Sequence, residues 1–220
     1  MKINVVLADD HQIFRDGIKA LLADDKTIEV LAEASGGDQL LSVLKSVLPE
    51  VLILDITLPD ISGIELTKII SEKYPSVKIL ILSMHTEEDF IINSLKNGAK
   101  GYLPKDTTKG ELLEAIHSIS SGCEFIGKQI TSTILKNYLR KNKKGASENK
   151  EDNQLTRREK DIIELIAKGL STKEIASSLF ISPKTVDCHK THILQKLNLK
   201  NSIELIIYSI KNRIIDLDKI

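Results

Sequence analysis

Short apolar runs alternate with segments of helical spacing along the first 120 residues. Runs rich in β-branched residues at 3–8, 28–34, 51–54, 77–82 and 102–103 predict five strands, the last of them very short. Strands that alternate with helices pair in parallel and are covered on both faces, which explains why the 51–54 run is apolar throughout. The pattern predicts an α/β domain with a flavodoxin-like, doubly wound, five-stranded parallel sheet.

The strand pattern stops at about residue 122. Ile130, Ile134 and Tyr138 fall at helical spacing and predict a connecting helix, and the polar, charged stretch 141–153 is typical of a linker. The predicted organisation has three parts: a domain at 1–121, a linker with a connecting helix at 122–153, and a second domain at 154–220.

Helix-start signals recur in both domains. In the first domain, Thr86 and Thr108 are each followed three residues later by an acidic residue, which predicts capping boxes. In the second domain, Thr156 and Ser171 are each followed at the same spacing by glutamate.

The second domain is predicted to be all-helical. Gly169 suits the end of its first helix, and Ser182 before a proline suits the start of its third. A fourth helix is expected from about 202 to 213, so the domain should be a small four-helix bundle.

Composition narrows the class of protein. Of 220 residues, 41% are hydrophobic, which is enough for real cores and excludes disorder of the whole chain. The two cysteines are too few for a disulfide scaffold and suit a reducing compartment. Apolar runs are far shorter than a membrane span, and the N-terminus lacks the features of a signal peptide. We therefore expect a soluble, cytoplasmic protein with no membrane partner.

The net charge of zero hides an asymmetry. Residues 1–140 carry five more acidic than basic side chains, and residues 141–220 carry five more basic than acidic ones. Such a division suggests two domains with different partners, the basic one suited to nucleic acid. A swing of this size also arises by chance, so it has little weight without a motif.

Polar residues follow the predicted strands of the first domain. Asp9 and Asp10 follow the first strand, Asp55 ends the third, Ser83 follows the fourth and Lys105 follows the fifth. Because the carboxyl ends of parallel strands share one edge, three carboxylates, one hydroxyl and one ammonium should converge there. Any one of these residues alone would be read as a loop cap or a surface charge.

This set of side chains suits phosphoryl chemistry. Clustered carboxylates repel one another unless a cation intervenes, and an oxygen-rich site open to water suits Mg²⁺. Asp55 can act as a nucleophile and form an aspartyl-phosphate. Lys105 and Ser83 could then hold the phosphoryl oxygens.

The same residues resemble the receiver domain of two-component response regulators, over roughly residues 2 to 121. The matching motifs are Asp9-Asp10, Leu54-Asp55 followed by Pro59 and Gly63, Ser83, and Tyr102-Leu103-Pro104-Lys105. The resemblance implies that Asp55 accepts phosphate from a histidine kinase. It implies Mg²⁺ held by Asp10, Asp55 and the backbone carbonyl of Thr57, and by Asp9 through water.

The resemblance also implies a switch pair. The hydroxyl of Ser83 would move toward the phosphoryl group while the ring of Tyr102 turns inward. Ser83 stands where the family often has threonine.

The third helix of the second domain divides into two faces. Val186, Ile193 and Leu197, with His189 beside them, should pack on the bundle. The opposite face is polar and comprises Lys184, Cys188, Thr191 and Gln195, with Asp187 and His192 at its margins. Two short helices joined by a tight turn form a helix-turn-helix, whose second helix enters the major groove. Three lysines could meet phosphates: Lys190, Lys196 and Lys200.

This segment is similar to the LuxR-type helix-turn-helix, over roughly 154 to 216. The similarity is carried by Leu155-Thr156-Arg157-Arg158-Glu159, Lys173-Glu174-Ile175-Ala176, Ile181-Ser182, Thr185-Val186, His189 and Lys196-Leu197. A receiver joined to this domain resembles the NarL/FixJ class of response regulators. The residues expected to bind DNA are Lys184, Thr185, Asp187, Cys188, Lys190, Thr191, Gln195 and Lys196.

By this resemblance Asp187, Cys188 and Thr191 face the bases. Many relatives carry basic residues at the first and last of these positions. An acidic residue can accept a hydrogen bond from cytosine, so the departures bear on the target sequence.

We interpret the chain as a regulator, not an enzyme, that binds promoter DNA. Phosphorylation would expose the recognition helix, promote formation of a homodimer, or both. One alternative is a phosphatase with an aspartate nucleophile. Those enzymes carry a second Asp two residues after the nucleophile as general acid, and Thr57 stands there in this chain. The other alternative is a helical domain that docks a protein, although polar Lys184, Thr191 and Gln195 fit DNA better.

Overall fold

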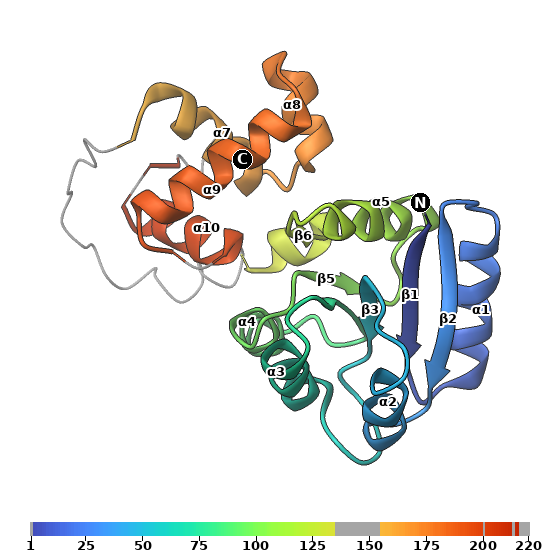
Figure 1. Ribbon diagram of the computed structural model, residues 1–220. Coiled ribbons are helices and arrows are strands. Elements are labelled where there is room, and N and C mark those ends of the chain that lie inside the picture. Colours follow the sequence, from blue (N-terminus) through green and yellow to red (C-terminus); the bar gives the residue numbers. More distant parts are fainter. Residues whose placement is uncertain (1, 135–154, 200, 213, 216–220) are drawn as a thin grey trace. The chain divides into compact units, whose positions relative to one another are not determined.

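The structure is a computed structural model that describes residues 2–134, 155–199, 201–212 and 214–215 (Figure 1). The chain forms two compact units, Met1–Ile126 and Gly127–Ile220. Within the described ranges, every helix is too short or too polar to cross a membrane.

The first unit is built on a six-stranded sheet in the order β2-β1-β3-β4-β5-β6, and every neighbouring pair of strands is parallel. This order confirms the predicted flavodoxin-like, doubly wound sheet. The strands are β1 (Ile3–Ala8), β2 (Ile28–Ala34), β3 (Val51–Leu54), β4 (Lys78–Ser83), β5 (Gly101–Pro104) and β6 (Phe125–Ile126).

The prediction of five strands was wrong by one. Phe125 and Ile126 pair with Gly101 and Tyr102 and add a short strand at the β5 edge. A strand of two residues is too short to show a period, so its sequence gave no signal. The sheet therefore continues into the segment that the pattern assigned to the linker.

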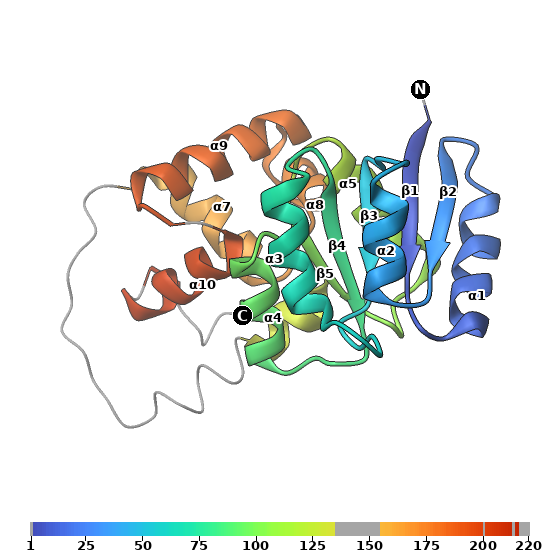
Figure 2. The same ribbon diagram turned by 60° about the horizontal axis from the view of Figure 1, so that its bottom comes forward.

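Five helices cover the two faces of this sheet, with α1 and α5 on one face and α2, α3 and α4 on the other (Figures 1 and 2). Ile18 and Leu22 of α1 and Ile116 of α5 share one core cluster with Leu7 and Ile53 of the sheet. Burying each such side chain contributes about 1.5–3 kcal/mol. The helices are α1 (Gln12–Ala23), α2 (Gly37–Leu44), α3 (Gly63–Lys73), α4 (Glu88–Lys96) and α5 (Lys109–Ser120).

The second unit contains the predicted four-helix bundle. Its core joins Ile163 from the first helix, Ile175 from the second, Val186 and Ile193 from the third and Leu205 from the fourth. The helices are α7 (Arg157–Ala167), α8 (Thr172–Leu179), α9 (Pro183–Lys196) and α10 (Ser202–Lys211).

The segment between the sheet and this bundle is described only in part. Residues 128–134 are helical, and Ile130 and Ile134 are buried. Tyr138 and the predicted linker at 141–153 lie outside the described residues.

The helix starts of the bundle form as the sequence predicts. Thr156 and Ser171 each exchange hydrogen bonds with the glutamate three residues later, so both capping boxes are complete. Gly169 adopts φ +74° just after α7, a conformation that glycine takes without strain. Ser182 caps α9 by accepting a hydrogen bond from the backbone N–H of Thr185.

In the first unit only one of the two predicted caps forms. Thr108 accepts a hydrogen bond from the Glu111 N–H at the start of α5. The Thr86 prediction was wrong, because α4 begins at Glu88 after Glu87 and has no side-chain cap. The loop that contains Thr86 is instead held by tertiary contacts of His85, which are described below.

Candidate functional site

Three predicted side chains from separate strands meet at the carboxyl edge of the sheet. Asp9 follows β1, Asp55 follows β3 and Lys105 follows β5. The Nζ atom of Lys105 lies 2.5 Å from Asp9 Oδ2 and 2.8 Å from Asp55 Oδ2. The three side chains are 7%, 7% and 3% exposed, so this is a buried charge cluster rather than a surface ion pair.

The Lys105 ammonium is held from several sides. Burial disfavours its charge, but the hydrogen bonds and negative charges of Asp55 and Asp9 outweigh burial and raise the pKa of Lys105 above 10.5. The ring of Phe14 lies 4.5 Å from Nζ and adds a cation–π contact. Lys105 is therefore a fixed positive charge beside Asp55.

The second carboxylate oxygen of Asp55 is not satisfied in the same way. Oδ1 is buried and has no hydrogen-bond partner among the described residues. Leaving a buried charged oxygen unpaired is costly, and such groups usually have a functional explanation. A cation or a reacting group beside Oδ1 would remove the cost.

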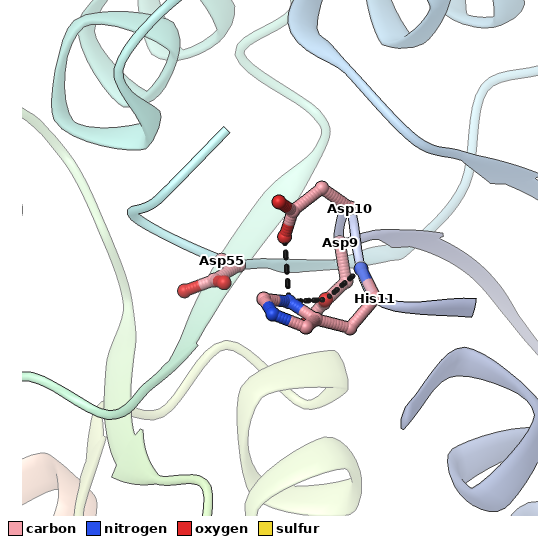
Figure 3. Close-up of side chains that lie close together, drawn as sticks. All are labelled: Asp9, Asp10, His11 and Asp55. Carbon is pink, nitrogen blue, oxygen red and sulfur yellow. Dashed lines mark hydrogen bonds and ion pairs between the residues drawn. The ribbon is translucent and has the colours of Figure 1, made fainter. Parts of the chain in front are cut away.

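Asp10 and His11 complete an acidic cluster with Asp9 and Asp55 (Figure 3). One possible ligand atom from each of Asp9, Asp10, His11 and Asp55 lies within 4.8 Å of the other three. The Nδ1 atom of His11 is 2.7 Å from Asp10 Oδ1, and the His11 backbone N–H donates to Asp9 Oδ1 at 2.8 Å. No pattern in the sequence indicated a role for His11, although this residue directly follows the acid pair.

A buried arginine supports the corner between β1 and α1. Arg15 is only 6% exposed, and its Nη1 donates to the backbone carbonyl of Asp9 at 2.5 Å. Its Nε donates to Glu33 Oε2 at 3.2 Å, which balances the charge. Arg15 therefore fixes the backbone that presents Asp9, a role that helical spacing alone does not reveal.

The loop after β3 is packed against Asp55 at Gly63 and is joined to the start of α2 by Asp60. A Cβ at Gly63 would overlap the Asp55 carbonyl oxygen and lie 2.7 Å from Ile56 Cα. Asp60 accepts hydrogen bonds from the backbone N–H groups of Asp38 and Gly37 at the start of α2, and these bonds lower the pKa of Asp60 to about 2.

The predicted switch residues meet at the loop after β4. Ser83 is fully buried, and its Oγ accepts a hydrogen bond from the His85 N–H at 3.2 Å. Tyr102 is also fully buried, and its hydroxyl donates to the His85 carbonyl at 2.6 Å. Burial raises the pKa of the Tyr102 phenol well above its ordinary value, so the group stays a neutral donor. Thr57 is exposed, and its Oγ1 is 3.3 Å from His85 Nε2.

Helix α9 presents the predicted polar face to solvent. Val186 and Ile193 are buried, and Leu197 and His189 are partly buried. Of the residues predicted to bind DNA, Asp187 and Lys190 are partly buried, whereas the exposed ones are Lys184, Thr185, Cys188, Thr191, Gln195 and Lys196. Lys200 lies outside the described residues.

Two residues of this set also have side-chain partners on other helices of the bundle. Asp187 accepts a hydrogen bond from Thr172 Oγ1 at 3.2 Å, which links α8 to α9. Lys196 lies 3.1 Å from Glu159 Oε2 of the first capping box. Both therefore have structural as well as surface roles.

A doubly wound parallel sheet with an acid cluster and a buried lysine at its carboxyl edge, together with a helix-turn-helix bundle, defines a response regulator with a DNA-binding domain. The response regulator receiver domain matches residues 5–117, and the luxR family of bacterial regulatory proteins matches residues 153–209. The chain belongs to the NarL/FixJ class of two-component response regulators, which act on transcription.

Similar proteins span nearly the whole chain. The oxygen regulatory protein NreC of Staphylococcus haemolyticus is 38% identical and covers 97% of this chain and 100% of its own length. The transcriptional regulatory protein DegU of Brevibacillus brevis is 35% identical, and the match covers 96% of this chain and 94% of DegU.

Solved structures are similar too. A structure of RcsB from Salmonella typhimurium has 28% identity and a TM-score of 0.59, and the match covers 94% of this chain and 97% of the RcsB chain. A structure of an RcsB–DNA complex has 27% identity and the same TM-score, and the match covers 96% of this chain and 99% of the RcsB chain.

Proposed function

We propose that a histidine kinase phosphorylates Asp55, and that this modification controls sequence-specific promoter binding by residues 154–220. The observation that carries the proposal is the state of the Asp55 carboxylate. One of its oxygens is paired with buried Lys105, and the other is buried without a partner among the described residues. This carboxylate is held in place and still has an oxygen available for reaction.

The chain supplies the groups that phosphoryl transfer needs. A carboxylate oxygen of Asp55 attacks the phosphorus, an O–P bond forms, and the P–N bond to the kinase histidine breaks. The imidazole of the kinase is the leaving group. Lys105 stays charged beside Asp55 and neutralises oxygens of the incoming phosphoryl group.

The donors around Asp55 fit Mg²⁺. Asp9, Asp10 and Asp55 supply carboxylate oxygens, and the backbone carbonyl of Thr57 would supply a fourth oxygen. Asp9 already binds Lys105 and the backbone of His11, so it suits contact with the ion through water. Bound Mg²⁺ would offset the charge of the phosphoryl oxygens.

Ser83 and Tyr102 connect the site to the loop after β4. Ser83 Oγ accepts from the His85 N–H, and Tyr102 donates to the carbonyl of the same residue. Movement of the Ser83 hydroxyl toward a phosphoryl oxygen would change both contacts. We infer that these residues form the switch that reads phosphorylation.

The output of the switch is DNA binding by α9. Its exposed polar face, described above, suits the major groove, and the half-buried Lys190 at its margin suits phosphates. The solved RcsB structures include two dimers bound to two parallel DNAs. We therefore propose a cytoplasmic protein that binds promoter DNA as a phosphorylated homodimer. The receiver would act without catalytic turnover, because Thr57 stands where a phosphatase carries its general acid.

Intact-mass measurement after incubation with Mg²⁺ and a small phosphodonor tests the site. The wild-type chain should gain one phosphoryl group, and Asp55→Asn should gain none. The matched control is Asp106→Asn, which changes an exposed aspartate that directly follows Lys105 in the chain. This variant should take up phosphate as the wild type does. Normal uptake by Asp55→Asn would show that the site is assigned wrongly.

A further inference from the structure

An imidazole lies inside the acidic cluster of Asp9, Asp10, His11 and Asp55 (Figure 3). The Nδ1 atom of His11 is 2.7 Å from Asp10 Oδ1 and 3.3 Å from Asp9 Oδ1. Adjacent ligands of an octahedral cation at ~2.1 Å are roughly 3 Å apart. The spacing of His11 Nδ1 and Asp10 Oδ1 therefore matches neighbouring corners of one coordination shell, while Asp9 lies close enough to contact the same ion through water.

A second, independent feature is a buried carboxylate oxygen in this cluster that has no hydrogen-bond partner among the described residues. Asp55 is 3% exposed, and its Oδ1 has no partner among the described residues. This carboxylate belongs to the same group of converging ligand atoms as the imidazole. A cation that bound the carboxylate of Asp55 would therefore lie within reach of His11.

The ring of His11 is not required by the core. Its side chain is 65% exposed, and its contacts with the described residues are with the two neighbouring acids. Imidazole is also a poor ligand for Mg²⁺, which prefers oxygen, but a good ligand for first-row transition cations. The sequence Asp-Asp-His thus adds a nitrogen donor to a site that oxygen donors would otherwise define.

We propose that His11 is a ligand of the cation through Nδ1, and that it raises the affinity of the site for cations such as Mn²⁺ relative to Mg²⁺. In the cation-bound form the ring would carry its proton on Nε2, and any proton on Nδ1 would have left to solvent, so that the Nδ1 lone pair would be available to the metal. The inference deepens the proposed function and rests on it, because the cation is the one that phosphoryl transfer to Asp55 uses.

Electron spin echo measurements on the full-length protein with Mn²⁺ test this assignment. Echo modulation detects a ¹⁴N nucleus bound to the metal, and an EPR titration gives the Mn²⁺ Kd. We expect ¹⁴N coupling in the wild type and its loss in His11→Ala. The Mn²⁺ Kd should rise about tenfold, while the Mg²⁺ Kd from competition changes by less than about threefold.

Two further variants control for indirect effects. His11→Asn keeps a polar side chain beside Asp10 but removes the imidazole, so it should lose the coupling as His11→Ala does. His117→Ala removes another partly exposed histidine, which pairs with Asp25 away from the cluster, and should keep both the coupling and the Mn²⁺ affinity.

The outcomes separate this inference from the function on which it rests. Mn²⁺ that is displaced by Mg²⁺ but shows no ¹⁴N coupling, or coupling that survives in His11→Ala, would overturn the role of His11 and leave the cation site intact. Failure of both cations to bind the wild-type chain would instead contradict the cation site, and with it this part of the proposed function.

Discussion

At the scale of single residues, Gly63 controls the position of Asp55, the proposed phosphoacceptor, through backbone sterics. A Cβ there would overlap the Asp55 carbonyl oxygen, which sits at the start of the loop between β3 and α3. The backbone on both sides is packed, since Asp55 and Ile56 are buried. A side chain at position 63 must therefore displace the segment that carries Asp55.

Gly63→Ala should destabilise the first unit by about 1–3 kcal/mol, the usual cost of overpacking, and should slow phosphorylation of Asp55. Urea unfolding and the rate of phosphoryl uptake measure the two effects. Gly110→Ala is the control, because a Cβ there meets no atom within 4 Å and alanine favours helices. Equal effects of the two substitutions would rule out the steric explanation.

Sequence could identify the chemistry of single residues only where topology determines their position. Asp9, Asp55 and Lys105 follow strands, and the carboxyl ends of parallel strands share an edge, so their meeting was predictable. Arg15 and His11 were missed, because their roles depend on where side chains at the start of α1 point. Strand order does not determine those directions.

At the scale of elements, the two capping boxes of the second unit contribute charge as well as hydrogen bonds. Glu159 is buried, which opposes its ionisation, but the backbone N–H of Thr156 and the side chain of Lys196 outweigh burial and lower the pKa of Glu159. Since the folded pKa lies below the ordinary value of 4.5, the ionised group stabilises the fold above pH 4.5. This contribution is lost as the pH falls through the folded pKa.

Glu159→Gln should lower the free energy of unfolding of the second unit by about 0.5–2 kcal/mol at pH 7. Below pH 4.5 the difference from wild type should shrink, because the wild-type carboxylate then becomes protonated. Hydrogen exchange of the α7 amides as a function of pH measures both trends. Glu164→Gln, which breaks an exposed ion pair with Lys168, is the control and should have little effect at any pH. A difference that stays constant down to pH 3 would contradict the role of charge.

The elements that the sequence predicted well are those specified by local signals. Apolar runs gave five strands, and the boxes at Thr156 and Ser171 gave two helix starts, because the residues that form these features are neighbours in the chain. The Thr86 signal failed because the backbone of His85 is bound locally by the hydroxyl of Ser83 and, from β5, by the hydroxyl of Tyr102. These contacts determine the loop. Strand β6 was not predicted, because a strand of two residues is too short to show a period of hydrophobic positions.

At the scale of the whole molecule, DNA recognition divides into base reading and backbone contact. Thr191 is exposed on α9 and donates to the Asp187 carbonyl within the helix, so removing its hydroxyl leaves the bundle core untouched. Lys196 is a poorer probe of phosphate contact than Lys190, because its loss would also unpair Glu159.

Thr191→Ala should change the relative affinities for different DNA sequences. Lys190→Ala should weaken binding to all DNA sequences alike. It should also reduce the salt dependence of the affinity by about one released counterion. Binding to a randomised DNA pool, followed by titration at several salt concentrations, distinguishes the two. A sequence profile unchanged in Thr191→Ala would remove that residue from the base-reading set.

Coupling between the two units requires that phosphorylation and DNA binding change each other's free energy. Ser83 is suited to transmit this coupling, because it is buried at the end of β4, the neighbour of β3 in the sheet. Its Oγ also binds the His85 backbone, which Tyr102 binds as well. Ser83→Ala should still accept phosphate at Asp55, since neither Asp55 nor Lys105 is altered. The ratio of DNA affinities of the phosphorylated and unphosphorylated forms measures the coupling, and such ratios are typically about 5–150 for allosteric pairs. In Ser83→Ala this ratio should fall toward one.

DNA titrations of the phosphorylated and unphosphorylated forms measure that ratio, with phosphorylation checked by mass in each sample. Ser121→Ala, an exposed serine just after α5, should keep the wild-type ratio. If Ser83→Ala also keeps the wild-type ratio, residues other than Ser83 couple phosphorylation to DNA binding. If Ser83→Ala fails to take up phosphate, the hydroxyl acts in the chemistry itself. A lost ratio with normal uptake is the only result that makes Ser83 a switch residue, because only then are acceptance and response separated in one variant.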